Sequence, residues 1–326
     1  MKYIKSPGND AYFNMALEEY FFEKNGEEFL ILWQNKNAIV VGKHQNTAEE
    51  INAERVRESG VSVVRRLTGG GAMYQDLGNV NYTFIVDREA DETLDFSLFT
   101  TAVVDALRAL GAPAQSGGRN DLLIDGKKIS GCSQFSKHGR TLHHGTLLFD
   151  SDLGFLSGAL NVSQQKIESK GVKSIISRVT NIRGYLKQDM DVPEFIEFLR
   201  AQLFERYELS EYTLTAADIA AIERLAKEKY STWDWIYGAS PPYSAKNERR
   251  FDAGTVSAQI YVCDGLIDSL KIFGDFFPRI DMDSIEAALT GLPPRTDAIL
   301  DALDRICAAG CIHGITNAEL SKLIAQ

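Results

Sequence analysis

Residues 65 to 82 read Arg-Arg-Leu-Thr-Gly-Gly-Gly-Ala-Met-Tyr-Gln-Asp-Leu-Gly-Asn-Val-Asn-Tyr, and they join two apolar runs, 61–64 and 80–86. Three consecutive glycines cost backbone entropy, so a chain keeps them where other residues do not fit. One such place is a loop whose N–H groups close around a phosphate or carboxylate, with arginines supplying charge. A glycine-rich turn between two strands is the alternative. The polar groups on both sides favour an anion-binding loop, because burying them without a ligand is costly.

The loop is neither a Walker loop nor a dinucleotide-binding fingerprint, because both have different glycine spacings. Residues 65–79 do match the signature Arg-Arg-x-Ser/Thr-Gly-Gly-Gly-Ala-x-x-His-Asp-x-Gly-Asn, except that Gln75 stands where His is usual. Similar matches recur at 42–46, 118–131, 143–148 and 177–181. The chain therefore resembles the lipoate-protein ligases of the A type with a C-terminal accessory domain, relatives of biotin ligases and octanoyltransferases.

The resemblance implies an α+β fold. We expect a large mixed-sheet domain of the biotin/lipoate ligase type with flanking helices, followed by a small α+β C-terminal domain. Residues 1–246 are the expected catalytic domain, which carries out adenylation and lipoyl transfer, and residues 247–326 the expected accessory domain. The second segment begins with alternating apolar and polar residues around Asp264-Gly265, a hairpin signal, and three short helical patterns follow.

Composition predicts a globular protein of the cytoplasm. The chain has 326 residues, of which 44% are hydrophobic and 25% charged, and no apolar run reaches the ~18 residues of a membrane span. Its start does not resemble a signal peptide, and four scattered cysteines without a Cys-x-x-Cys pair predict reduced thiols. The net charge of −10 argues against nucleic acid as a partner.

The residues before the loop supply candidates for an apolar pocket. Asn9 and Asp10 can cap a helix, and strands are expected at 29–33 and 38–42. In the resembled family the start of this helix borders the lipoyl pocket. By resemblance, Met15, Leu17 and Glu18 would reach the ligand and Trp33 would form a wall of the pocket. For all of these positions ordinary core packing is the alternative.

A lysine follows the Asp125-Gly126 turn. The hairpin places Lys128 on a strand near Leu123, with Lys127 pointing to the opposite, solvent-facing side. A strand lysine without further context most often faces water. The resemblance reverses that expectation, because Lys128 falls on the lysine of the family's Gly-x-Lys-x-x-Gly motif.

The resemblance implies ATP-dependent ligation of free lipoate to a specific lysine of an acceptor domain, through a lipoyl-adenylate. ATP and Mg²⁺ are the expected cofactors, and Lys128 is the expected catalytic residue. The acceptors would be lipoyl domains of 2-oxoacid dehydrogenase E2 subunits, the glycine cleavage H protein, or both. The residues expected to bind ATP or the adenylate are Arg66, Gly69, Gly70, Gly71, Ala72, Met73, Tyr74, Asn79 and Lys128. Those expected at lipoate are Met15, Leu17, Glu18, Trp33, Arg66, Thr68, Lys128 and His144. The expected magnesium ligand is Asp121.

Two other functions stay open at this point. One is an octanoyl or lipoyl transferase of the same fold, which uses a cysteine instead of ATP. The cysteine of those relatives lies shortly before the Gly-x-Lys motif, where this chain reads Arg119-Asn120-Asp121. Cys132 could be read as a nucleophile, but core packing is favoured, and His143 is expected to be structural. The other possibility is a non-catalytic acyl-binding protein, against which the intact loop and Lys128 argue.

Overall fold

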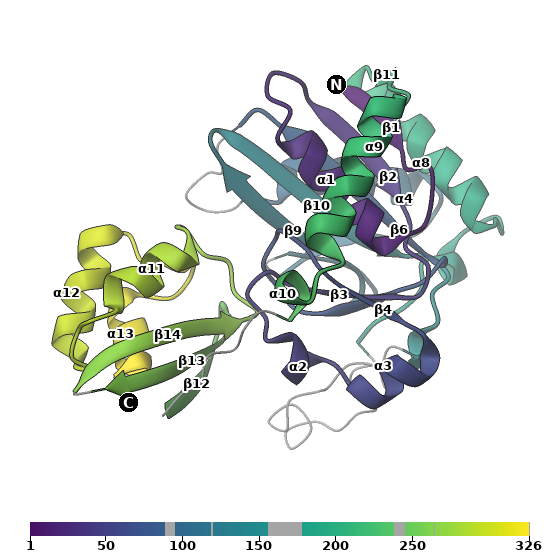
Figure 1. Ribbon diagram of the computed structural model, residues 1–326. Coiled ribbons are helices and arrows are strands. Elements are labelled where there is room, and N and C mark those ends of the chain that lie inside the picture. The colour runs from purple at the N-terminus through teal and green to yellow at the C-terminus, as the bar shows by residue number, and fades with distance from the viewer. Residues whose placement is uncertain (89–94, 119, 156–177, 238–244, 264, 326) are drawn as a thin grey trace. The chain divides into compact units, whose positions relative to one another are not determined.

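The computed structural model describes residues 1–88, 95–118, 120–155, 178–237, 245–263 and 265–325 (Figure 1). The chain forms two compact units. The first unit comprises residues 1–40, 48–67 and 73–236, and the second comprises residues 41–47, 68–72 and 237–326. The triple-glycine loop thus belongs to the second unit, together with the C-terminal segment.

An eight-stranded mixed sheet is the frame of the first unit. Only β11, β1 and β2 run parallel to one another, and the remaining pairs are antiparallel. In spatial order the strands are β11 (Ser210–Glu211), β1 (Lys2–Lys5), β2 (Phe29–Trp33), β6 (Asn79–Val86), β10 (Arg140–Leu148), β9 (Lys127–Lys137), β8 (Asp121–Ile124) and β7 (Gln115–Gly117).

Helices cover both faces of this sheet, since α1 (Ala11–Phe22) packs with α9 (Ala216–Leu225) and α4 (Ser97–Ala109) packs with α8 (Val192–Tyr207) (Figure 1). Successive side chains along β6 point to opposite faces of the sheet, and their contacts identify each face. Phe84 packs against Phe99 of α4, with ring centroids 5.5 Å apart. Thr83 instead reaches Glu18 of α1 through a 2.5 Å hydrogen bond. We call these the α4 face and the α1 face of the sheet.

The start of α1 follows its sequence signals. Asp10 is the N-cap, and its carboxylate accepts a hydrogen bond from the backbone N–H of Phe13 at 2.8 Å. In the sequence, Gly26 predicts the end of this helix, but α1 ends earlier, at Phe22, with Glu23 as its C-cap. Gly26 lies in the following turn and has a positive φ of 81°.

A smaller sheet has the order β4 (Ser62–Arg65), β3 (Ala38–Val41) and β5 (Met73–Gln75). In the segment before it, the capping-box pair Thr47 and Glu50 predicts one helix that ends near Gly60. The structure has two helices there, α2 (Thr47–Glu50) and α3 (Ala53–Ser59). The Asn52 side chain interrupts the run, because it accepts a hydrogen bond from the Arg55 N–H and caps α3, which ends at the left-handed Gly60.

The remaining short elements of the first unit are η1 (Arg183–Tyr185), the single π-helical turn η2 (Ala226–Tyr230) and α10 (Trp233–Ile236). The sequence predicts helices at 216–230 and at 163–169. The first is α9 followed by η2, and the second lies outside the described residues. In the described part of the chain, no helix has the length and apolarity to cross a membrane.

The second unit has its own antiparallel sheet, with β13 (Gly254–Cys263) between β12 (Ala245–Phe251) and β14 (Leu266–Gly274). One face of this sheet and the helices α11 (Met282–Leu289), α12 (Thr296–Ile306) and α13 (Asn317–Ile324) enclose a separate hydrophobic core. The sequence predicted the β13–β14 hairpin and the three helices. It missed β12, because the charged run Lys246 to Arg250 has no alternating apolar residues.

Candidate functional site

Lys128 lies on β9 opposite Leu123, as the hairpin predicted, and Lys127 beside it is exposed. A register shift between Leu122 and Leu123 leaves Ile129 as an extra, fully buried residue on β9. On the other side, the Lys128 backbone N–H donates to the Arg178 carbonyl at 2.7 Å, and its carbonyl accepts from the Thr180 N–H at 3.0 Å. The backbone of Lys128 is therefore held from both sides.

Gly131 makes room for the Lys128 ammonium. A Cβ added at Gly131 would lie 2.9 Å from Lys128 Nζ and 3.1 Å from its Cε, closer than ordinary contact distance. The ammonium thus crosses over Gly131 and forms an ion pair with Asp121, at 2.7 Å between Nζ and Oδ1. The Lys128 side chain keeps 39% of its surface exposed and Asp121 keeps 34%, so both remain accessible to a ligand.

The α1 face of the sheet next to this lysine carries a buried hydrogen-bond relay. Trp33 Nε1 donates to Thr83 Oγ1 at 2.9 Å, and Thr83 Oγ1 donates to Glu18 Oε1. His144 Nδ1 lies 2.9 Å from the same Glu18 oxygen. Ser133 pairs with His144 and is two residues beyond Gly131, so Lys128 and His144 project from the same face of the sheet.

The apolar candidates lie in the core on this face. Met15 and Leu17 are 1% and 0% exposed, Trp33 is 5% exposed, and all three belong to one hydrophobic cluster. Because the relay holds the indole N–H of Trp33, the ring has a fixed orientation. The structure accordingly brings together five of the residues expected at lipoate: Met15, Leu17, Glu18, Trp33 and His144.

The two arginines of the signature have different surroundings. Arg65 is anchored, because its guanidinium donates to the carbonyls of Trp235 and Ile236 while Trp235 Nε1 donates to the Arg65 carbonyl. Arg66 is 2% exposed and donates to the Val40 carbonyl at 3.2 Å. Burial lowers the pKa of Arg66 to about 10, and the nearby Glu18 carboxylate opposes that shift.

Three more residues expected to bind the nucleotide follow the triple-glycine loop: Met73, Tyr74 and Asn79. Met73 pairs with Val40 across the small sheet. Tyr74 is buried, its hydroxyl donates to Asn37 Oδ1 at 3.1 Å, and its ring packs against Phe155. Asn79 begins β6 and is 1% exposed.

The other loop candidates, Thr68 to Ala72, belong to the second unit. The Thr68 carbonyl accepts a hydrogen bond from the Lys43 N–H at 2.8 Å, and Gly70 has a positive φ of 89°. A Cβ added at Gly69 would lie 2.4 Å from the Phe276 carbonyl oxygen, whereas one added at Gly71 would meet nothing within 4 Å. Gly69 therefore permits close packing on the segment after β14, and Gly71 remains exposed.

Cys132 and His143 lie on the opposite, α4 face. Cys132 is 3% exposed, its Sγ lies 3.2 Å from the Tyr82 hydroxyl, and burial raises the pKa of its thiol. His143 is fully buried and stacks on Phe99 at 4.6 Å, and burial lowers its pKa well below the usual value. A protonated thiol behind the sheet and a neutral core histidine agree with the expectation that both residues are structural.

Asp121 was the candidate metal ligand. Magnesium in phosphate-transfer sites is commonly held by one or two carboxylates together with substrate phosphates. One partly exposed carboxylate beside a lysine fits that donor set. Among the described residues, no group of three or more His, Cys, Asp or Glu side chains is arranged to hold a metal by itself.

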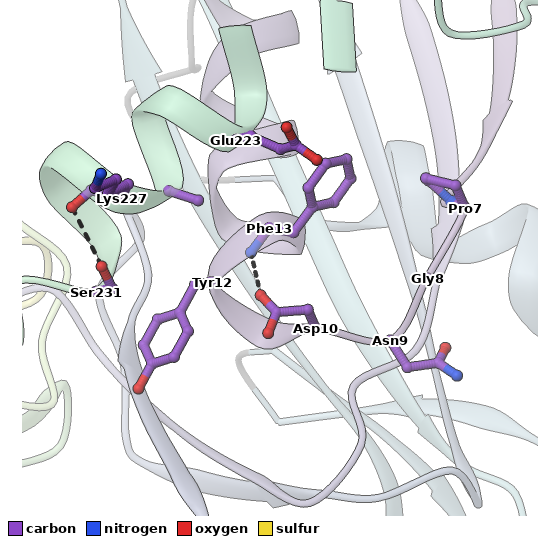
Figure 2. Close-up of a pocket in the computed structure, with 10 residues that line it drawn as sticks. Pro7, Gly8, Asn9, Asp10, Tyr12, Phe13, Glu223, Lys227 and Ser231 are labelled. Atoms are coloured by element: carbon purple, nitrogen blue, oxygen red, sulfur yellow. Dashed lines mark hydrogen bonds between the residues drawn. The ribbon is translucent and has the colours of Figure 1, made fainter. Parts of the chain in front are cut away.

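A cavity of about 490 Å³ opens elsewhere in the first unit, where the loop before α1 faces η2 (Figure 2). Its lining includes Tyr12, Phe13 and Lys227, and Asp10 caps α1 at its edge. None of the residues expected at lipoate or ATP lines it. It is therefore distinct from the Lys128 site.

Comparison with known families gives two matches that cover most of the chain. Residues 10–204 match the lipoyl protein ligase A/B catalytic domain, and residues 240–324 match the bacterial lipoate protein ligase C-terminus. The lipoate-protein ligase LplJ of Bacillus subtilis is 42% identical over 97% of both chains. Lipoate–protein ligase 1 of Staphylococcus aureus is 38% identical over the full length of both.

Solved structures agree in fold. P. falciparum LipL1 superimposes with a TM-score of 0.79 and 24% identity, covering 93% of this chain and 94% of that one. A lipoate-protein ligase A bound with ATP has a TM-score of 0.64 and 26% identity, with coverages of 73% and 98%. The bipartite lipoate protein ligase of Thermoplasma acidophilum, described with its E2 lipoyl domain, has a TM-score of 0.64, 28% identity and coverages of 75% and 98%.

The fold and the lysine-bearing sheet thus define an α+β enzyme of the lipoate ligase type, as the sequence predicted. The chain belongs to the lipoate-protein ligase family, and its activity is that of a lipoate-protein ligase.

Sequence reasoning missed the supporting residues of this site. Thr83 joins Trp33 to Glu18, and Gly131 accommodates the Lys128 ammonium. The polar residues Asn81 and Thr83 inside the otherwise apolar run at 80–86 were the available signal, because polar side chains in a buried strand need partners.

Proposed function

We propose that this chain joins free lipoate to a lysine of an acceptor domain in two steps, through a lipoyl-adenylate made from ATP. The observation that supports this most is the Lys128 ammonium, held over Gly131 and beside Asp121 on the face that carries Glu18 and His144. An ammonium at this position supplies the fixed positive charge that acyl adenylation requires.

In the first step, a lipoate carboxylate oxygen attacks the α-phosphorus of ATP. A new P–O bond forms to the carboxylate, the bond to the β-phosphate oxygen breaks, and pyrophosphate leaves. Negative charge on the carboxylate and on the α-phosphate oxygens is stabilised by a preorganised cation, and we assign this role to Lys128. Arg66 would add charge, and the backbone from Gly69 to Ala72, with Met73, Tyr74 and Asn79, would hold phosphate and adenine.

Mg²⁺ would neutralise the charge of the triphosphate and of the leaving pyrophosphate. Asp121 is the residue that would hold it, together with substrate phosphates. The same carboxylate would remain close enough to Lys128 to keep its ammonium oriented.

The lipoyl chain would lie along the α1 face. Met15, Leu17 and Trp33 would supply apolar surface, and Glu18 and His144 would supply polar groups. Ordinary core packing accounts equally well for the burial of Met15 and Leu17, so substitution at Trp33 is the more direct test of the pocket.

In the second step, the neutral amine of an acceptor lysine attacks the acyl carbon, an amide bond forms, and AMP leaves. The Thermoplasma acidophilum relative, described with an E2 lipoyl domain, supports acceptors of that class. We propose lipoyl domains of 2-oxoacid dehydrogenase E2 subunits, the glycine cleavage H protein, or both. All four cysteines are free thiols, which agrees with a cytoplasmic location.

We further propose residues 1–246 as the catalytic domain and 247–326 as the accessory domain. The close packing of Gly69 on the Phe276 carbonyl supports a role for the C-terminal segment in shaping the loop that would bind the nucleotide. The boundary itself is open to test by expressing the two segments separately.

The experiment that tests the proposal is lipoate-dependent release of pyrophosphate without any acceptor. Lys128→Ala should lower this rate by roughly a hundredfold or more, the scale for losing one preorganised charge donor. Lys127→Ala is the matched control, because Lys127 is exposed on the same strand, and it should be mild. Equal effects of the two substitutions would refute the assignment of Lys128.

A further inference from the structure

Five buried carboxamide side chains form a continuous chain of hydrogen bonds from α1 to β6. Each is 2% exposed or less, and in order they are Asn14, Asn35, Gln75, Asn81 and Asn79. Gln75 stands at the centre, and it is the residue that departs from the signature described above. It accepts from Asn35 Nδ2 and donates to Asn81 Oδ1, both at 2.9 Å.

The donor-to-acceptor direction of this chain of hydrogen bonds is fixed at the Asn14 end. Asn14 Nδ2 also donates to the backbone carbonyl of Gln34 at 2.8 Å, and a carbonyl can only accept. The amide nitrogen of Asn14 must therefore lie on that side, and each following carboxamide is oriented by the one before it. At the far end, Asn81 Oδ1 accepts from both Gln75 Nε2 and Asn79 Nδ2, each at 2.9 Å.

Asn79 is oriented as a result. If its amide were flipped, its oxygen would face the Asn81 oxygen at hydrogen-bonding distance, which is repulsive. Its Oδ1 consequently points away from Asn81, and this buried oxygen has no hydrogen-bond donor within the described residues. A buried acceptor without a donor is destabilising, and a ligand that brings a donor relieves that cost.

The position of Asn79 agrees with a ligand role. Asn79, Asn81 and Thr83 alternate along β6 and share the α1 face, which also carries the Lys128 ammonium. Lipoate, as a carboxylate anion with a dithiolane ring, offers no hydrogen-bond donor, and the phosphate oxygens of ATP are acceptors. Of the two adenylation substrates only the nucleoside carries donors, on its exocyclic amine and its ribose hydroxyls.

We propose that Gln75 is a positioning residue for nucleotide binding, which acts through Asn81 to present Asn79 Oδ1 to a hydrogen-bond donor of the adenosine moiety. The proposal rests on the function proposed above. It assigns Gln75 a role in affinity for ATP and none in affinity for lipoate.

A Gln75→Glu substitution tests the direction of this chain of hydrogen bonds, because the glutamate side chain has almost the same shape as the glutamine side chain. In the wild type Asn81 Nδ2 also donates to Gln75 Oε1, but at 3.4 Å, and the shorter 2.9 Å contact is the one made by Asn81 Oδ1. The carboxylate has no donor for that oxygen, so Asn81 should flip to place its amide nitrogen at the shorter distance, and Asn79 should flip in response. Asn79 would then present an N–H group to the donor of the nucleoside. Once protonated, the introduced carboxyl group carries an O–H that can donate to Asn81, so the original direction should return at low pH.

The measurement is the KM for ATP and for lipoate in acceptor-free pyrophosphate release, from pH 8 to pH 5.5. Gln75→Glu should raise the KM for ATP by roughly tenfold to a hundredfold at pH 8, the range for one reversed hydrogen bond, and leave the KM for lipoate unchanged. The ratio of variant to wild-type KM should fall toward one as the pH drops. The charged and titratable groups that the structure places near this face, Glu18, Arg66, Lys128 and His144, are the same in both proteins.

Gln134→Glu is the matched control. Gln134 is also a buried glutamine, 7% exposed, but it lies on the α4 face, where its Nε2 approaches His143 Nδ1 at 3.1 Å. It should show any general effect of a buried carboxylate without a selective change in the KM for ATP. Equal effects on ATP and lipoate in Gln75→Glu, or a ratio that does not vary with pH, would overturn the proposal.

Nucleotide analogues identify the donor on the wild-type enzyme, and they keep the test valid if Gln75→Glu does not fold. Purine riboside triphosphate lacks the exocyclic amine, 2′-deoxy-ATP lacks the 2′-hydroxyl, and 3′-deoxy-ATP lacks the 3′-hydroxyl. One of the three should bind about as weakly to the wild type as ATP binds to Gln75→Glu, and the substitution should add no further loss for that analogue. No loss with any of the three would overturn the proposal.

Two results separate this inference from the proposed function. A wild-type enzyme that releases no lipoate-dependent pyrophosphate contradicts the proposed function itself. An active wild type whose Gln75→Glu variant is impaired only when an acceptor is added would assign the donor to the acceptor lysine, and would overturn the inference alone.

Discussion

Gly131→Ala should lower the rate of adenylation by about a hundredfold without unfolding the enzyme. The added Cβ would lie 2.9 Å from Lys128 Nζ and 3.1 Å from Cε, whereas unstrained contacts begin near 3.5 Å. The ammonium must therefore move by about 0.5 to 1 Å from the position in which it contacts Asp121 at 2.7 Å. A displacement of this size at a reacting centre lowers rates by about a hundredfold.

Stability should change little. The Lys128–Asp121 pair is partly exposed and contributes about 0–1 kcal/mol. Gly131 does not have a positive φ, so alanine introduces no backbone strain, and its lower entropy in the unfolded chain offsets part of any loss. The assay is single-turnover adenylation together with thermal unfolding. Gly184→Ala, where a Cβ meets nothing within 4 Å, is the control. A Gly131→Ala enzyme with wild-type rate and stability would refute the assigned position of the ammonium.

Four further results are expected. Trp33→Ala should raise the KM for lipoate far more than that for ATP, because lost apolar contact acts mainly on uniform binding, and equal changes would count against the pocket. Cys132→Ser should retain most ATP-dependent activity. Wild-type enzyme incubated with ATP, Mg²⁺ and lipoate should show no added mass after denaturation. A stable acyl adduct that is absent from Cys132→Ser would instead indicate a transferase. Gly69→Ala should destabilise the second unit through its 2.4 Å approach to the Phe276 carbonyl, whereas Gly71→Ala should not, as limited proteolysis can measure. Burial raises the pKa of Asp218, but hydrogen bonds from Lys24 and Tyr20 outweigh it and leave the pKa below its usual value. Asp218 therefore adds stability above about pH 4 that is lost as the pH falls through its lower folded pKa, and melting temperatures from pH 7 to pH 3 should show a shallower decline in Asp218→Asn.

The sequence predicted elements whose signals are local. The Asp125-Gly126 turn, the Asp10 cap and the run at 29–33 all appear where the pattern placed them. Two errors came from competition between local signals. Asn52 capped a second helix inside the expected one, and charged residues concealed β12.

The candidate site also combines residues that the sequence indicates with residues that only the structure shows. The resemblance selected Lys128, Glu18 and His144 as single residues, and the structure adds how they are held. The sequence could mark Thr83 only as a polar residue in a buried strand, because its role depends on Trp33 and Glu18 from distant segments. The role of Gly131 depends on the register shift that turns the Lys128 side chain over it, which the sequence does not show. The carboxamide chain around Gln75 is a further case, since its direction depends on a backbone carbonyl at Gln34.

The central claim is that lipoate is activated by ATP and then transferred to a lysine of an acceptor. Intact-mass measurement of a purified lipoyl domain, incubated with enzyme, lipoate, ATP and Mg²⁺, tests it most directly. We expect the domain to gain the mass of one lipoyl group, only when ATP is present, and not when its acceptor lysine is replaced. Modification without ATP, or none with all components and a competent acceptor, would contradict the account.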